Sequence, residues 1–75
     1  MRYLLMDGNE VEGDTATDIV CAMNDAKMTP ARDLAVYRNA LAGRVLQIYP
    51  HAEVDPTTDE SLLASLERAN LIERL

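Results

Sequence analysis

The order of apolar and polar residues at the start of the chain predicts a β-hairpin. Residues 2–6, RYLLM, form an apolar run, and Asp7-Gly8 is a turn dipeptide that accommodates a positive φ angle. Residues 10–13, EVEG, then supply a short alternating arm. In a strand, Tyr3 and Leu5 point to one face and the residues of even number point to the other. Both faces of the first strand are therefore apolar, so helices are expected to cover one face and something else to shield the other.

A first helix is predicted over about 16–27. Thr15 followed by Asp18 has the spacing of a capping box, in which each side chain bonds the other residue's backbone N–H. The apolar residues that follow recur with helical spacing and form one face: Ile19, Ala22, Met23 and Ala26.

A second helix is predicted over roughly 30–48. Thr29-Pro30 is a start signal, because proline is tolerated at the first helical position. Five apolar residues then share an arc of about 80° and predict a core-facing stripe: Leu34, Tyr37, Leu41, Val45 and Ile48. Tyr49-Pro50 ends this helix, since proline disfavours α geometry in the preceding residue. An extended connection follows, with one candidate short strand around Glu53–Val54.

A third helix begins at Thr57, with Glu60 in the capping-box position. Its apolar face consists of Leu62, Leu63, Leu66 and Ala69. If the helix continued, Asn70 would rotate onto that face, and asparagine is the best substitute for glycine at a left-handed helix end. The helix is therefore predicted to end near Ala69, with 71–75 as a separate extended tail beside the first strand. A frayed tail and a further helical turn against another chain are the alternatives.

These elements predict an α+β fold in one small domain spanning 1–75: an N-terminal strand or hairpin, three helices and a returning C-terminal tail. The alternative is an all-α bundle whose two ends are merely extended. A chain of this length supports a small core, and its single cysteine excludes an internal disulfide.

The charge of the chain favours some classes of binding partner over others. Seven basic against thirteen acidic residues give a net charge of −6. The three segments 1–26, 27–51 and 52–75 carry −5, +3 and −4. Nucleic-acid binding depends on basic side chains that neutralise phosphates, so nucleic acid is a disfavoured partner. The preferred explanation of the negative charge is that it keeps the protein soluble. The second explanation is a basic protein partner.

No catalytic, cofactor-binding or metal site is predicted. His51 is the single histidine, and Cys21 lies on a helix flank beside acids that oppose thiolate formation. The acid-rich stretch 51–60 lacks the order of a calcium loop, and 7–14 lacks the basic residue of a phosphate loop. An enzyme would need a concave pocket that contains His51 or paired acids.

The arginines of the second helix favour structural pairing over nucleic-acid binding. Arg32, Arg38 and Arg44 lie about 120° apart on the helical wheel, so they form no basic stripe. Arg38 and Arg44 flank the apolar stripe, where their heads can reach carboxylates on neighbouring helices. A helix followed by a tail also suggests a helix-turn-helix regulator. The third helix would then be the recognition helix, but it would expose mainly acidic side chains, which are unsuited to contacts with DNA.

The chain resembles a group of small, uncharacterised bacterial proteins. The similarity rests on an opening strand and turn ending at Glu12-Gly13, and on apolar and capping positions further along the chain: Thr15, Asp18, Ile19, Val20, Met23, Tyr37, Leu63, Leu66, Ala69, Leu71 and Ile72. Members of the group usually carry glycine where this chain has Asn70. The resemblance implies a strand or hairpin with three helices, and it implies no activity.

The resulting hypothesis is a non-enzymatic, cytoplasmic protein-interaction or regulatory module without a cofactor. A helix-turn-helix-like regulator is the alternative. An edge strand with apolar sides can pair with another chain, which makes a homodimer a candidate. The predicted interaction residues are Tyr3, Leu5, Leu71, Ile72 and Leu75. No apolar run approaches the ~20 residues of a membrane span, and a lone thiol fits a reducing compartment.

Overall fold

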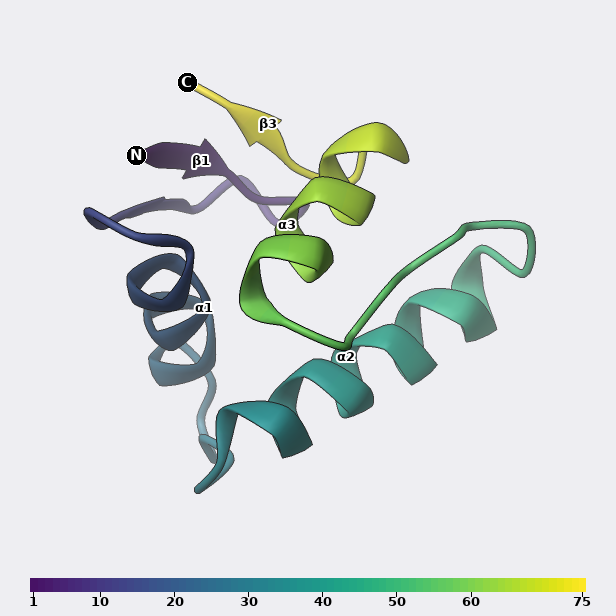
Figure 1. The fold of residues 1–75 in the computed structure, drawn as a ribbon, viewed down its shortest axis with the longest axis horizontal. Coiled ribbons are helices and arrows are strands. Elements are labelled where there is room, and N and C mark those ends of the chain that lie inside the picture. The colour runs from purple at the N-terminus through teal and green to yellow at the C-terminus, as the bar shows by residue number, and fades with distance from the viewer.

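The computed structural model, which describes residues 1–75, contains a three-stranded antiparallel sheet and three helices (Figure 1). The elements are β1 (Arg2–Leu4), β2 (Glu10–Glu12), α1 (Ala16–Asp25), α2 (Leu34–Ile48), α3 (Asp59–Arg68) and β3 (Glu73–Arg74). The sheet order is β2-β1-β3, so the C-terminal strand lies beside the N-terminal one. The predicted α+β class is confirmed, and the all-α alternative is wrong.

The hairpin and the start of α1 form from local hydrogen bonds. Gly8 adopts a φ of 88°, as the predicted turn requires. At the other end of β2, a Cβ on Gly13 would lie 2.4 Å from the Cβ of Asp18, so only glycine fits there. This close approach lets the Asp18 carboxylate accept the Thr15 N–H while Thr15 Oγ1 accepts the Asp18 N–H. The predicted capping box is confirmed.

The C-terminal tail returns to β1 because α3 ends in a left-handed residue. Asn70 has a φ of 60°. Beyond it, the Leu71 N–H donates to the Leu66 carbonyl at 2.9 Å, which closes the helix end. The tail then pairs antiparallel with β1, placing Tyr3 opposite Arg74, and the Leu75 N–H donates to the Arg2 carbonyl at 2.9 Å. The predicted helix end and tail pairing are confirmed, and the frayed or helical alternatives are wrong.

One apolar core joins the inner face of the sheet to all three helices. Figure 1 shows the sheet above α1 and α3, with α2 below them. The core contains Tyr3, Val11, Ala16, Ile19, Val20, Met23, Tyr37, Leu41, Val45, Leu62, Leu63, Leu66, Leu71 and Ile72. Burial raises the pKa of the Tyr37 hydroxyl above its ordinary value. Most of the positions that helical periodicity predicted to face inward therefore do so.

Two helices begin later than predicted. Asn24 holds Ala31 by two hydrogen bonds of 2.9 Å to its backbone N–H and carbonyl, so residues before Asp33 stay outside α2. The Asp33 carboxylate then caps the helix by accepting the Ala35 N–H at 2.7 Å. These contacts, rather than Thr29-Pro30, set the start of the helix.

The start of α3 is shifted by one residue for a similar reason. Asp55 accepts both the N–H and the hydroxyl of Thr57, which engages Thr57 in a local turn. Thr58 therefore becomes the N-cap and forms a capping box with Ser61. The connection before this turn is extended, and the candidate strand at Glu53–Val54 is absent.

A buried ion pair fastens the three helices to one another. Arg38 Nη1 on α2 lies 2.6 Å from Asp59 Oδ1 on α3, and the two side chains are only 16% and 11% exposed. The Thr17 hydroxyl on α1 donates to the second Asp59 oxygen at 2.7 Å. Arg38 Nε also donates to the Pro56 carbonyl at 2.9 Å. The predicted pairing with a neighbouring carboxylate is confirmed for Arg38, whereas Arg44 forms no ion pair.

Replacing Asp59 tests the energetic weight of this cluster. We expect Asp59→Asn to lower the free energy of unfolding by about 3 kcal/mol, because it leaves the Arg38 charge buried without a partner. The matched control is Glu10→Gln, which breaks the exposed Arg2–Glu10 pair and should cost less than about 1 kcal/mol. Urea denaturation measures both values. Equal effects of the two substitutions would contradict a special role for the buried pair.

Candidate interaction surface

The structure places most of the predicted interaction residues inside the chain's own core. Tyr3, Leu71 and Ile72 are 1%, 9% and 5% exposed, and Leu5 is half-buried against the same core. Of the five, Leu75 alone is well exposed, at 54%. The reason is the tail pairing, which directs Leu71 and Ile72 inward. Because β2 and β3 occupy both sides of β1, this strand offers no free edge for a second chain.

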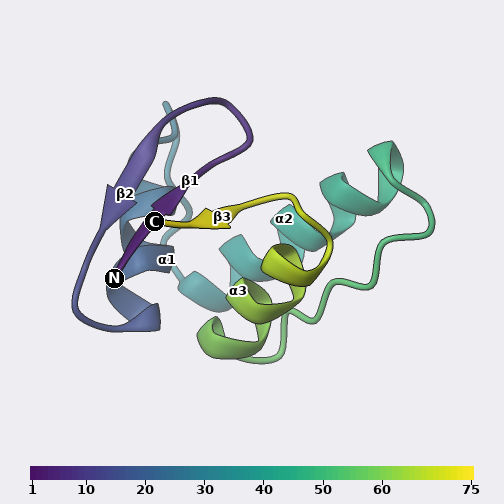
Figure 2. The ribbon, with the colours of Figure 1, turned by 90° about the horizontal axis from the view of Figure 1, so that it is seen from above.

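The outer face of the sheet is small and mainly polar. No other element of the chain covers this face (Figure 2). Arg2 and Glu10 form an exposed ion pair of 2.8 Å there, beside the half-buried Leu4. The expectation that something shields both faces of β1 therefore holds for the helical face alone.

The stripe of α2 that faces the core continues beyond the core. Val45 is 3% exposed, whereas Ile48, one turn later on the same stripe, is 70% exposed. In Figure 1 the last turns of α2 extend past α3 before the chain returns through the connection that follows. The prediction that Ile48 is a core residue is wrong for this isolated chain. An apolar side chain with core periodicity remains in solvent.

A groove of about 700 Å³ lies at this end of the molecule. It is formed by the end of α2, the connection after it and the end of α3. The lining residues are Ile48, Tyr49, Pro50, His51, Ala52, Glu53, Ser65, Arg68, Ala69, Asn70 and Leu71. Its volume lies within the ~300–1,000 Å³ typical of ligand pockets. Apart from Leu71, none of the predicted interaction residues lines it.

Hydrogen bonds to α3 hold the far end of the connection. The buried Ser65 hydroxyl accepts the Asp55 N–H at 3.0 Å and donates to the Leu62 carbonyl at 2.9 Å. The hydrogen bond from the Thr57 hydroxyl lowers the pKa of the Asp55 carboxyl below its ordinary value, so Asp55 stays ionised and continues to accept. One wall of the groove is therefore fixed by α3.

His51 and Glu53 bring titratable groups to the groove. It is thus a concave pocket containing His51, as an enzyme would require. However, no hydrogen bond orients the exposed His51 ring, and the hydroxyl proton of Ser65 is already donated. Cys21 lies on α1 and does not line the groove. Nucleophile, base and orienting group are therefore not assembled there.

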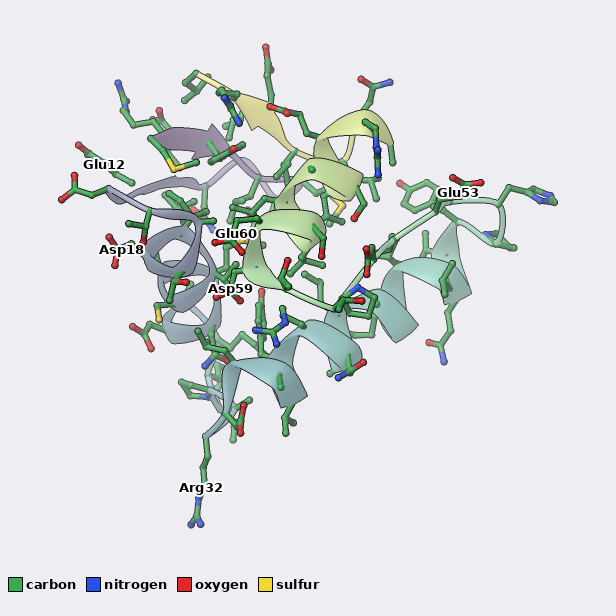
Figure 3. The ribbon with its side chains drawn as sticks, viewed as in Figure 1. Glu12, Asp18, Arg32, Glu53, Asp59 and Glu60 are labelled. Carbon is green, nitrogen blue, oxygen red and sulfur yellow. The ribbon has the colours of Figure 1, made fainter.

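The acid-rich stretch does not gather into one cluster. Figure 3 shows Glu53 on the connection, well apart from Asp59 and Glu60 at the start of α3. No group of three or more His, Cys, Asp or Glu side chains is arranged to hold a metal ion. None of the helices combines the length and apolar character needed to cross a bilayer.

Two opposite charges at the groove lack ion-pair partners within the chain. The ion pairs of the structure join Arg2 to Glu10, Arg38 to Asp59 and Arg74 to Glu67. Arg68 and Glu53, both exposed, take part in none of them. Arg68 contributes only the smallest of the effects that lower the Asp55 pKa. Both groups are available to an occupant of the groove.

The different exposure of Val45 and Ile48 has a direct energetic consequence. We expect Val45→Ala to lower the free energy of unfolding by about 2 kcal/mol, because it leaves a cavity in the core. Ile48→Ala should change it by less than about 0.5 kcal/mol, because the side chain is already in solvent. Denaturation at low micromolar concentration, where self-association contributes least, compares the two. A large loss for Ile48→Ala in the dilute chain would mean that Ile48 belongs to the core.

Comparison with known proteins adds no relative to this picture. No protein-family model matches the chain, and no match is found among curated proteins or solved structures. The resemblance to small bacterial proteins stays a prediction.

Proposed function

We propose that the chain is a non-enzymatic protein-interaction module and that the groove is its docking site. The observation that carries this proposal is the 70% exposure of Ile48 on a helix face that is otherwise buried. A side chain with core periodicity that protrudes beside a groove is suited to packing against another protein. Whether the module acts as an adaptor or a regulator then depends on the partner that it binds.

Burial of this surface would supply binding energy. Complete burial of a side chain such as isoleucine contributes about 1.5–3 kcal/mol, and most of the Ile48 side chain is still available. Tyr49, which is 48% exposed, adjoins it and is of a residue type enriched at interaction hot spots. Arg68 and Glu53 at the same groove can fix the orientation of a partner.

The other groups of the groove support this function over catalysis. His51 has no orienting partner, so it lacks the arrangement of a general base with a nucleophile. The burial of Arg38 against Asp59 also argues against a helix-turn-helix regulator, because this arginine cannot contact phosphate. The free, half-buried thiol of Cys21 fits a reducing compartment, and we assign the module to the cytoplasm.

Replacing Ile48 by an aspartate tests the docking site. A pull-down with wild-type chain, Ile48→Asp and Val36→Asp compares the groove with another exposed apolar position on α2, where Val36 is 59% exposed. We expect Ile48→Asp to reduce capture of a specific partner at least tenfold, because burying its carboxylate in the contact is costly. Val36→Asp should retain capture.

Circular dichroism of both variants checks that they remain folded. Equal capture by the wild type and Ile48→Asp would contradict the proposal. A photo-crosslinker introduced at Tyr49 provides a second readout, because the partner should then become covalently attached next to the groove.

A further inference from the structure

The protruding side chain and the groove lie on the same surface patch. Ile48 projects from the end of α2 and also lines the groove between that end and α3. A twofold dimer brings the same patch of two molecules together, so the patch must be complementary to itself. A protruding apolar residue beside a partly apolar groove meets this requirement, because each copy can insert Ile48 into the groove of the other.

Charge does not oppose contact between two copies at this patch. Each chain carries a net charge of −6, so acidic faces of two copies repel each other. Among the Asp, Glu, Lys and Arg residues, the groove is lined by Glu53 and Arg68, one of each sign, so their formal charges cancel. The patch is therefore one where two acidic molecules can meet without adding repulsion at the contact.

The two unpaired charges also supply a specific interaction for such a dimer. Arg68 stands on α3 and Glu53 on the connection that follows α2. Both line the groove, and neither has an ion-pair partner within the chain. In a twofold arrangement, Arg68 of each copy can face Glu53 of the other. Two symmetric ion pairs then border the inserted Ile48 side chains.

We propose that the occupant of the groove is a second copy of this chain, in a twofold dimer with exchanged Ile48 side chains and crossed Arg68–Glu53 pairs. This inference rests on the proposed function, because it names the protein that the groove binds. It replaces pairing through β1, which has no free edge in the fold.

The contact of such a dimer has to extend beyond the groove. A standard interface buries about 800 Å² on each partner, roughly a sixth of the 4887 Å² exposed by this chain. A second hollow shares Tyr49, Asn70 and Leu71 with the groove and extends to Leu4 on β1 and Met6 in the hairpin turn. Met6 is 54% exposed, so the apolar patch continues past the groove itself.

Charge reversal tests the dimer by sedimentation equilibrium from micromolar to millimolar concentration. We expect wild-type chain to dimerise, and Glu53→Arg or Arg68→Glu alone to raise the dissociation constant at least ~10-fold, because each reversal creates two like-charge contacts. The double variant Glu53→Arg with Arg68→Glu should restore dimerisation. Ile48→Asp should abolish it.

Matched controls separate the pairing from the change in net charge. Glu60→Arg and Arg32→Glu change the net charge by the same amounts at labelled positions that lie away from Glu53 (Figure 3). Neither control variant should raise the dissociation constant as much as Glu53→Arg or Arg68→Glu does.

The failures of the two proposals can be told apart. A wild-type chain that is monomeric up to millimolar concentration would overturn the second copy as occupant. If Ile48-dependent capture of a different protein persists, the interaction function stands with a heterologous partner. A dimer that is unaffected by the reversals, or is not restored by the double variant, would overturn the crossed pairing.

Discussion

The left-handed turn at Asn70 is the constraint on which the rest of the structure depends. Its φ of 60° stops α3 and sends the last five residues back across the molecule. That reversal puts Leu71 and Ile72 into the core and gives β1 a neighbour on its second side. In a chain this short, about 40% of the unfolded surface remains exposed after folding, so two further buried apolar side chains matter. Had the helix continued, β1 would keep a free edge suited to pairing with another chain.

The same turn helps to decide where a partner can bind. Once β1 is enclosed by β2 and β3, the notable apolar surface lies at the end of α2 and the end of α3. The Arg38–Asp59 pair fastens the N-terminal half of α2 to the start of α3, and the C-terminal turn of α2 lies beyond the core. Ile48 is exposed for that reason. A docking surface thus follows from how one helix is held, with no separate binding motif in the sequence.

Local signals in the sequence predicted most of the fold. Thr15 with Asp18, and Asn70 at the phase break, act through backbone hydrogen bonds within a few residues, so their roles can be inferred without tertiary information. The start of α2 could not, because it depends on the Asn24 side chain bonding to Ala31 across a loop.

The candidate site was less predictable, because helical periodicity gives the direction of a side chain and not the extent of the core. Ile48 has the direction of a core residue and lies past the edge of the core. Tyr3 and Ile72 were predicted to contact a partner and are instead buried in the core of their own chain. The sequence could not decide this, because the tail could have paired with β1 of its own chain or of a second copy. The one available signal for the groove was an apolar stripe running up to Tyr49-Pro50, where the helix had to end.

The central claim is that the C-terminal tail pairs with β1 of its own chain, and nuclear magnetic resonance tests it most directly. Tyr3 and Arg74 face each other, and because Arg2 bonds to Leu75, they form the closer, non-hydrogen-bonded type of pair. A nuclear Overhauser effect should therefore connect their Hα protons in dilute protein, where contacts between chains are absent. Loss of this effect, with a freely mobile tail or with an effect seen only between differently labelled chains, would contradict the account.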